Sequence, residues 1–257
     1  MYNLLTQIIT AFNGKPIIGY HRNETSDLNT LLSCIMHDEY GIQKLDIQDG
    51  DVIIDVGAHI GAFTLALYAL GVKLGVYCYE PIPENYNILF KNLEDNDLQD
   101  FGYCWQKAVV GKKRDHLRIY YGDDSFDGLA HKFIGTHVDN PPETWKRGYV
   151  DAEAITLEQI FKENKIAQCK VLKMDCEGTE YEILEHAPAE VLDCIDYIIG
   201  EHHGVGDKTF NNSREYLLSL TKNKFIDITP EPTDKAQGAF LFVNKRKGVK
   251  LYGPGKT

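Results

Sequence analysis

The chain has 257 residues, of which 43% are hydrophobic and 25% are charged, so it can bury a core and is not composed like a disordered segment. Its formal net charge is −11 at pH 7. Because binding to nucleic acid or to an anionic membrane requires a surface rich in lysine and arginine, we expect neither of these partners and favour a small molecule.

The first 50 residues predict helices. Residues 2–12 and 27–38 carry apolar side chains at helical spacing, and Ser26 or Asp27 can cap the second helix. From residue 51 the pattern changes, which predicts a domain boundary. The expected organisation is an N-terminal helical extension at 1–50, a main domain at 51–246 and a C-terminal tail at 247–257.

The main domain alternates strands with helices. A β-branched run at 52–56 is typical of a strand buried on both faces of a parallel sheet, and a glycine-rich turn, a helix and a second strand follow it as a βαβ unit. We predict helices at 62–70, 83–93, 156–164, 177–186 and 212–222, and strands at 75–79, 102–109, 117–121, 171–175, 197–201, 225–228 and 239–243. This alternation predicts an α/β fold: a Rossmann-like, doubly wound, mostly parallel seven-stranded sheet whose last two strands pair as an antiparallel hairpin.

Residues 122–150 interrupt this alternation, because they are rich in Gly, Asp, His and Pro. A long irregular segment within a compact domain is often functional. Its aromatic side chains, Phe133, Trp145 and Tyr149, can form either a lid that stacks on a ligand or an apolar plug that holds the segment on the sheet.

The turn after the first predicted strand predicts the nature of the ligand. It contains Asp55, Gly57 and Gly61, but His59 stands where a dinucleotide-binding turn has its middle glycine. The Asp55 carboxylate would repel a pyrophosphate and would favour a ligand with an ammonium and a sulfonium group, as in S-adenosylmethionine. Glu80 ends the next strand, where an acidic residue can accept both ribose hydroxyls.

Five blocks of sequence together resemble the FkbM-type methyltransferases. Residues 54–61 read IDVGAHIG, 80–92 read EPIPENYNILFKN and 172–180 read LKMDCEGTE, which contains the K-x-D-x-E-G-x-E block typical of that family. Upstream, 25–27 read TSD and 39–40 read EY. The blocks keep the order that they have in the family.

The resemblance implies a Rossmann-like methyltransferase with S-adenosylmethionine as its cofactor. It places the methionine end of the cofactor against Asp55, Gly57, Ala58, His59 and Gly61, the ribose against Glu80, and the adenine against Ala108. His59 stands where the family usually carries Asn, so this position keeps a polar side chain of different shape and basicity.

Polar side chains that follow two later strands are candidates for the catalytic site. Methyl transfer to a hydroxyl requires removal of its proton, and His203 is our first candidate for the base, ahead of Asp175. Glu177 is either a third catalytic group or a cap of the following helix, on which Glu180, Glu182 and Glu185 are expected to form an exposed acidic face. Asp175, Glu201 and His203 could instead hold a divalent metal, but no metal-binding spacing supports this, and we predict none.

The sequence therefore predicts an S-adenosylmethionine-dependent methyltransferase that O-methylates a hydroxyl on a small molecule, such as a sugar or another secondary metabolite. An NAD-dependent oxidoreductase and a non-catalytic nucleotide-binding module are the alternatives, since both can use the same sheet. The N-terminus lacks the features of a signal peptide, and the cysteines are scattered, so we expect the protein in the cytoplasm.

Overall fold

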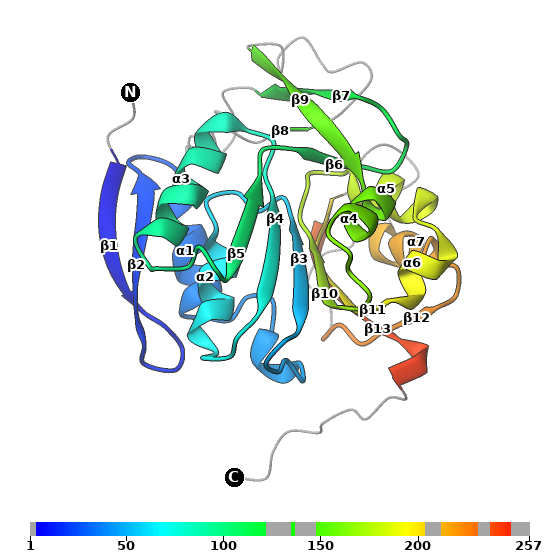
Figure 1. Cartoon of the computed structure of the whole chain (residues 1–257), viewed down its shortest axis with the longest axis horizontal. Helices are drawn as coiled ribbons and strands as arrows, with labels where there is room; N and C mark the ends of the chain where they lie inside the picture. Colours follow the sequence, from blue (N-terminus) through cyan, green and yellow to red (C-terminus); the bar gives the residue numbers. More distant parts are fainter. Residues whose placement is uncertain (1–3, 122–134, 137–147, 204–211, 231–236, 248–257) are drawn as a thin grey trace.

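The computed structural model describes residues 4–121, 135–136, 148–203, 212–230 and 237–247 (Figure 1). Its main sheet has seven strands in the order β12-β13-β11-β10-β3-β4-β5. Their bounds are Phe225–Asp227, Gln237–Asn244, Ile195–His203, Cys169–Met174, Val52–Val56, Gly75–Tyr79 and Gly102–Trp105. The strands from β11 to β5 run parallel, whereas β13 is antiparallel to both of its neighbours, which confirms the predicted fold class and C-terminal hairpin.

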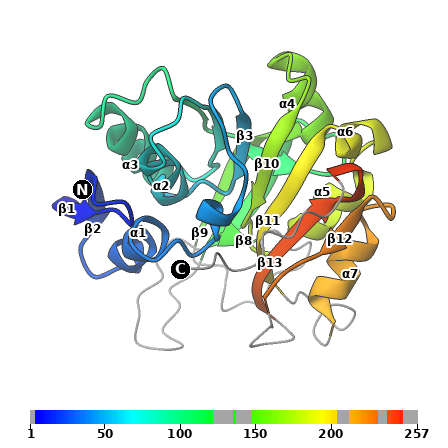
Figure 2. The same ribbon diagram turned by 90° about the horizontal axis from the view of Figure 1, so that it is seen from below.

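Helices cover both faces of this sheet, as Figure 2 shows. One group contains α1, α2 and α3, and the other contains α4, α5, α6 and α7. In that order they span Asp27–Ile35, Ala62–Ala69, Pro83–Glu94, Leu157–Glu163, Glu180–His186, Ala189–Asp193 and Ser213–Ser219. Among the residues described above, no helix combines the length and the hydropathy needed to cross a membrane.

Alternation along the central strands creates two hydrophobic cores. In β3, Ile53 packs with the side chains of α1, α2 and α3, whereas its neighbour Ile54 packs with those of α4 to α7. In β10, Val171 and Leu172 divide between the two cores in the same way. Successive side chains of a strand point to opposite faces, so a strand with apolar residues on both faces becomes the middle layer of three.

The N-terminal segment differs from its prediction. Residues 4–10 form strand β1 (Leu4–Thr10), which pairs antiparallel with β2 (Pro16–Arg22), so the predicted helix over 2–12 is wrong, whereas the second predicted helix is confirmed as α1. The hairpin buries Ile9 and Ile17 in the same core as Ile53 of the main sheet. The N-terminal extension therefore shares its hydrophobic core with the domain that follows.

A second, four-stranded sheet lies beyond the end of β5, at the top of Figure 1. It has the order β6-β9-β7-β8, with bounds Ala108–Val110, Gly148–Thr156, His116–Tyr121 and Gly135–Thr136. The strand predicted over 102–109 is thus two strands in two sheets, and β9 begins inside the segment predicted to be irregular. Phe133 and Trp145 lie outside the described residues, and with them most of the predicted lid.

Candidate functional site

The order of the main sheet reverses between β3 and β10, because the chain first builds outward through β4 and β5 and later returns to the other side of β3. In open α/β sheets, ligands bind beyond the carboxyl ends of the strands at such a reversal. The turn that contains Gly57 follows β3, and Asp175 follows β10. The Asp175 amide donates to the Val56 carbonyl at 3.2 Å, so the two halves of the predicted site adjoin.

The turn after β3 needs its glycines for packing. Gly57 has φ +72°, and a Cβ there would lie 1.9 Å from the Asp175 carbonyl oxygen. Gly61 has φ +86°, and a Cβ there would lie 2.7 Å from a methyl group of Leu89. Both glycines were expected to lie against the methionine end of the cofactor. The structure adds that they let β10 and α3 approach the turn.

We therefore predict that Gly57→Ala destabilises the fold beyond the cost of its left-handed backbone. Gly50 is the matched control, because it has φ +86° and a Cβ there would meet nothing within 4 Å. The Gly50→Ala variant should cost about 1–2 kcal/mol, the cost of the conformation alone. Gly57→Ala should cost about 1–3 kcal/mol more, because the backbone must shift away from Asp175. Urea unfolding measures both variants, and equal losses would contradict the packing role.

A buried ion pair lies beneath the same turn. Asp55 has no exposed surface, and its carboxylate lies 3.2 Å from Lys173 Nζ of the neighbouring strand β10. The ammonium also donates to the Gly57 carbonyl at 2.7 Å. Burial alone lowers the pKa of Lys173, but the carboxylates of Asp55 and Asp175 raise it above its ordinary value. Lys173 therefore stays charged, and the pair supports the turn from below.

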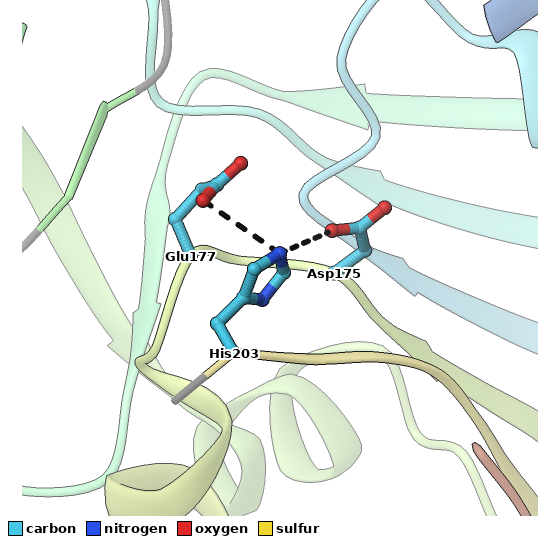
Figure 3. Close-up of side chains that lie close together, drawn as sticks. All are labelled: Asp175, Glu177 and His203. Carbon is cyan, nitrogen blue, oxygen red and sulfur yellow. Dashed lines mark ion pairs between the residues drawn. The ribbon is translucent and has the colours of Figure 1, made fainter. Parts of the chain in front are cut away.

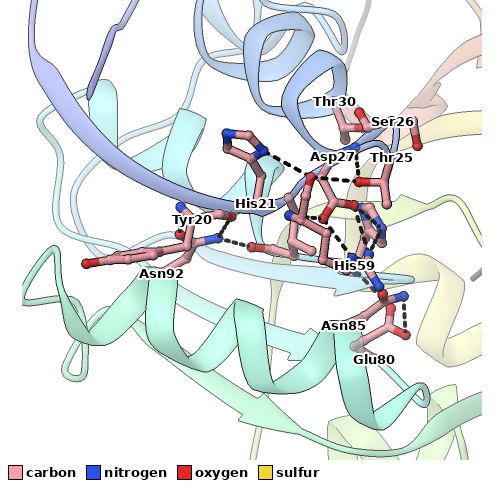
Figure 4. A network of polar contacts seen from close by, with 12 residues as sticks. Tyr20, His21, Thr25, Ser26, Asp27, Thr30, His59, Glu80, Asn85 and Asn92 are labelled. Carbon is pink, nitrogen blue, oxygen red and sulfur yellow. Dashed lines mark hydrogen bonds and ion pairs between the residues drawn. The ribbon is translucent and has the colours of Figure 1, made fainter. Parts of the chain in front are cut away.

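Glu80, at the end of β4, lies against the other side of the turn (Figure 4). Its carboxylate accepts from the His59 amide at 2.8 Å, from the Ile82 amide at 2.9 Å and from Asn85 Nδ2 at 3.3 Å. Burial nevertheless raises the pKa of Glu80 to about 6. Among the described residues, the buried Asn85 Oδ1 has no hydrogen-bond partner, so an acceptor beside Glu80 remains available.

The side chain of His59 points toward the N-terminal segment (Figure 4). Its Nε2 lies 3.2 Å from Arg22 Nη2 and 3.4 Å from Asp27 Oδ1, and Arg22 and Asp27 form a bidentate ion pair at 2.8 Å. Burial lowers the pKa of His59 to about 4, so its ring is neutral at pH 7. Asp27 belongs to the TSD block. Neither Ser26 nor Asp27 caps α1 with its side chain, as was expected of one of them, and the Asp27 carboxylate pairs with Arg22 instead. The last predicted cofactor residue, Ala108, is buried in β6.

Asp175, Glu177 and His203 converge at the ends of β10 and β11, and we name them the acid–histidine cluster (Figure 3). His203 Nε2 lies 3.9 Å from Asp175 Oδ1 and 3.7 Å from Glu177 Oε2. Helix α5 begins only at Glu180, and no side chain caps it, so the alternative that Glu177 caps this helix is wrong. Glu177 instead has φ +55° in the loop before α5, which directs its side chain into the cluster.

Glu180 is the clearest correction to the predicted site. It was expected on an exposed face of α5, but it has no exposed surface. Its Oε1 accepts from the Cys176 amide at 2.7 Å and lies 3.4 Å from His203 Nδ1. Because Glu180 is the first residue of α5, it faces back toward β10 and β11 rather than toward solvent. Glu185, on the same helix, is exposed as predicted.

Tyr40 is a further member of the site that the sequence analysis did not assign. Its hydroxyl donates to Asp175 Oδ2 at 2.7 Å, across 135 residues of sequence. The ring packs edge-on against Phe63 of α2 at 5.3 Å between centroids, which holds the hydroxyl in place. The only sequence signal was the EY block, because nothing local relates Tyr40 to β10.

The electrostatics of the cluster differ from the prediction of a neutral histidine. Burial by itself lowers the pKa of His203, but the carboxylates of Glu180, Glu177 and Asp175 outweigh it and raise the pKa to about 10. Burial also raises the pKa of Glu177 to about 7, although His203 opposes that shift. With these values the imidazole carries a proton at pH 7. His203 can therefore act as a neutral base only when another positive charge in the cluster lowers the pKa of its imidazole.

Strand β11 divides its last three side chains between the two faces of the sheet. Glu201 and His203 share one side, with 4.0 Å between their nearest charged atoms. His202 points the other way and is buried, with its Nδ1 2.5 Å from the Ser213 hydroxyl. His202 therefore belongs to the packing of α7 on the sheet, whereas His203 belongs to the site.

Comparison with known proteins shows sequence similarity to methyltransferases. The FkbM methyltransferase domain matches residues 55–226. The chain is 25% identical over 164 residues to hexuronic acid methyltransferase AglP of Haloferax volcanii, which is 63% of this chain and 61% of that protein. It is 24% identical over 182 residues to 31-O-demethyl-FK506 methyltransferase FkbM of Streptomyces tacrolimicus, which is 63% of this chain and 68% of that protein.

A solved FkbM methyltransferase from Methylobacillus flagellatus KT superposes with a TM-score of 0.49 at 16% identity, over 77% of this chain and 44% of that one. The family assignment does not depend on this superposition. The matched domain covers most of the main sheet, the turn after β3, and both Asp175 and His203. The chain therefore belongs to the FkbM methyltransferase family.

Proposed function

We propose that the protein uses S-adenosylmethionine to methylate a hydroxyl group on a small molecule, such as a sugar or a related metabolite. The family supports methyl transfer, and two relatives are named for a hexuronic acid and for 31-O-demethyl-FK506. The net charge of −11 favours a small acceptor over a nucleic acid. When bound, S-adenosylmethionine supplies an electrophilic methyl group on a sulfonium sulfur.

The residues around the turn after β3 fit such a cofactor. Glu80 would accept from the ribose hydroxyls, and the buried Asn85 Oδ1 beside it offers a further acceptor. The backbone of Gly57, Ala58, His59 and Gly61 would line the methionine end. Asp55 would act only through the turn, since the carboxylate has no exposed surface. Ala108 would contribute to the adenine pocket through the backbone of β6.

The acid–histidine cluster would receive the acceptor hydroxyl. S-adenosylmethionine would supply the methyl group, with the carbon–sulfur electron pair left on sulfur, and the cluster would hold the hydroxyl oxygen that receives it. The hydroxyl proton passes to the cluster, which supplies the polar groups that general base catalysis requires. The observation that carries this proposal is that Asp175, Glu177 and His203 converge where the sheet order reverses, next to the turn after β3.

The first test is ligand-induced stabilisation. S-adenosylmethionine and S-adenosylhomocysteine should each raise the unfolding temperature, because binding at a hundredfold excess over Kd stabilises the native state by about 2.7 kcal/mol. NAD at the same concentration is the control for the oxidoreductase alternative and should leave the temperature unchanged. Stabilisation by NAD alone would overturn the proposal.

We predict that Glu80→Ala weakens S-adenosylhomocysteine binding by about 1.5–3 kcal/mol, because hydrogen bonds to a charged acceptor would be lost. Calorimetry measures the affinity. The Glu80→Gln variant removes the charge but keeps an oxygen that can accept from the His59 amide. It therefore separates the effect of the lost charge from the effect of a disturbed turn. Glu94→Ala, on the exposed end of α3, is the control and should bind like the wild type.

The same carboxylate should make binding depend on pH. The pKa of Glu80 is about 6, since burial raises it against the opposing effects of Ile82, His59, Asn85 and Lys173. Wild-type affinity for S-adenosylhomocysteine should therefore be constant above pH 7 and should fall as the pH drops through about 6. An affinity that is unchanged by Glu80→Ala and flat between pH 5 and pH 8 would remove Glu80 from the cofactor site.

A further inference from the structure

We propose that the acid–histidine cluster binds a divalent cation, which holds two neighbouring oxygen atoms of the acceptor. The inference rests on the proposed function, because it specifies how the acceptor would be held beside the methyl donor. One ligand atom from each of Asp175, Glu177 and His203 lies within 4.8 Å of the other two. The cluster joins the ends of two strands and a loop, so sequence spacing alone could not reveal it.

The distances within the cluster suit a shared cation better than direct hydrogen bonds. His203 Nε2 lies 3.9 Å from Asp175 and 3.7 Å from Glu177, beyond the ordinary range of about 2.7–3.2 Å for an N–H donor. A cation about 2.0–2.3 Å from each of the three atoms would bridge such separations. The side chains therefore point at a common centre without satisfying one another.

Two further residues orient the ligands from behind. Glu180 Oε1 lies 3.4 Å from His203 Nδ1, the ring nitrogen opposite the one that faces Asp175 and Glu177, although the two atoms do not form a hydrogen bond. Tyr40 occupies Asp175 Oδ2 and leaves Oδ1 facing His203. A carboxylate behind a histidine is the usual outer-shell arrangement of metal sites. Glu180 is fully buried, and its Oε2 has no hydrogen-bond partner among the described residues. This is expected of a carboxylate whose role in the site is its negative charge.

The charge of the site also calls for a cation. Four carboxylates, from Asp175, Glu177, Glu180 and Glu201, lie within 4.0 Å of the imidazole of His203. Glu180 is fully buried and the other three carboxylates are only partly exposed, so their mutual repulsion is costly unless positive charge offsets it. The nearest buried ammonium, that of Lys173, lies against Asp55 and the Gly57 carbonyl. Two oxygen ligands and one imidazole match Mn²⁺ or Mg²⁺.

Three protein ligands leave open positions on a cation that takes six. Two oxygens of the acceptor, such as vicinal hydroxyls, could fill neighbouring open positions, which would fix the orientation of the molecule. A cation also lowers the pKa of an oxygen that it binds. The acceptor class is thus a molecule with two adjacent oxygen atoms, of which one is methylated.

The test is Mn²⁺ binding to the chelator-treated full chain, measured by the loss of the free-ion electron paramagnetic resonance signal. We expect one Mn²⁺ per chain in the wild type. Asp175→Asn, Glu177→Gln and His203→Ala should each weaken binding at least tenfold, and Glu180→Gln by about 10–100-fold, the usual range for an outer-shell partner. Glu185→Gln is the matched control, because this carboxylate is exposed on the same helix, and it should bind like the wild type.

Failure of this inference is distinguishable from failure of the proposed function. No saturable Mn²⁺ binding, or equal weakening by Glu185→Gln, would overturn the cation site. Stabilisation by S-adenosylhomocysteine in EDTA does not involve the cation, so it tests the methyltransferase proposal separately. Circular dichroism spectra that match the wild type would show that the variants fold. Competition of Mg²⁺ with Mn²⁺ in the wild type but not in Asp175→Asn would further support the site.

Discussion

An Asp175→Asn variant should lose a factor of about 10²–10⁴ in kcat, the range for a lost acid–base group, and still bind S-adenosylhomocysteine within about threefold of the wild type. Asp175 lies at the centre of the site: Tyr40 donates to one of its oxygens, and His203 faces the other. The substitution keeps the shape of the side chain and removes its charge. Methylated product measured by mass spectrometry gives kcat, and calorimetry gives the affinity.

His203→Ala is the companion variant, and it should lower kcat over the same range. Glu185→Gln, exposed on α5, serves as the control and should keep the wild-type rate. Wild-type turnover in both Asp175→Asn and His203→Ala would exclude the acid–histidine cluster from the reaction. A large loss in Asp175→Asn with a nearly silent His203→Ala would make the carboxylate the base and reduce His203 to a wall of the pocket.

Lys173→Met should be among the most destabilising substitutions in the chain, with an expected loss of about 3–5 kcal/mol in the free energy of unfolding. Removal of the ammonium would leave Asp55 as a buried charge without its partner, and the Gly57 carbonyl would lose its donor. Urea unfolding followed by circular dichroism measures the loss. In a chain of this size it should lower Tm by roughly 6–20 °C.

The surface pair of Lys224 and Asp193 supplies the control, because their charged atoms lie 2.6 Å apart but both side chains are partly or largely exposed. Lys224→Met should cost no more than about 1 kcal/mol. A double variant of Lys173→Met with Asp55→Asn should be less destabilised than the two single losses added together, since neither charge remains buried alone. Strict additivity would contradict the pairing.

The main sheet could be predicted because its signals are local. Runs such as 52–56 and 171–175 are mostly apolar, and they are strands in the structure within two residues of the expected bounds. The segment 2–12 carried no such signal. Its apolar residues fit helix and strand equally well, and pairing with β2 decided between them. That pairing depends on a second segment of the chain. The spacing of apolar residues within 2–12 alone could not reveal it.

The site could be predicted only in part, for a similar reason. Asp175, Glu177 and His203 were found because each follows a predicted strand, and parallel strands end at one edge of a sheet. Tyr40 lies 135 residues before its partner Asp175, and no periodicity relates the two. Glu180 was misjudged because its neighbours Glu182 and Glu185 suggested an acidic face. The carboxylate of Glu180 faces inward because Glu180 is the first residue of α5, and the sequence did not show that the helix begins there.

The ion pair beneath the turn also imposes an order on biosynthesis. Lys173 follows Gly57, whose carbonyl it binds, by 116 residues. At roughly 5–20 residues per second on the ribosome, about 6–24 s separate the synthesis of Asp55 from that of its counter-charge. During this interval the nascent chain cannot close over Asp55, and β3 lacks its neighbour β10. The turn after β3 therefore takes its final form only after β10 has been made.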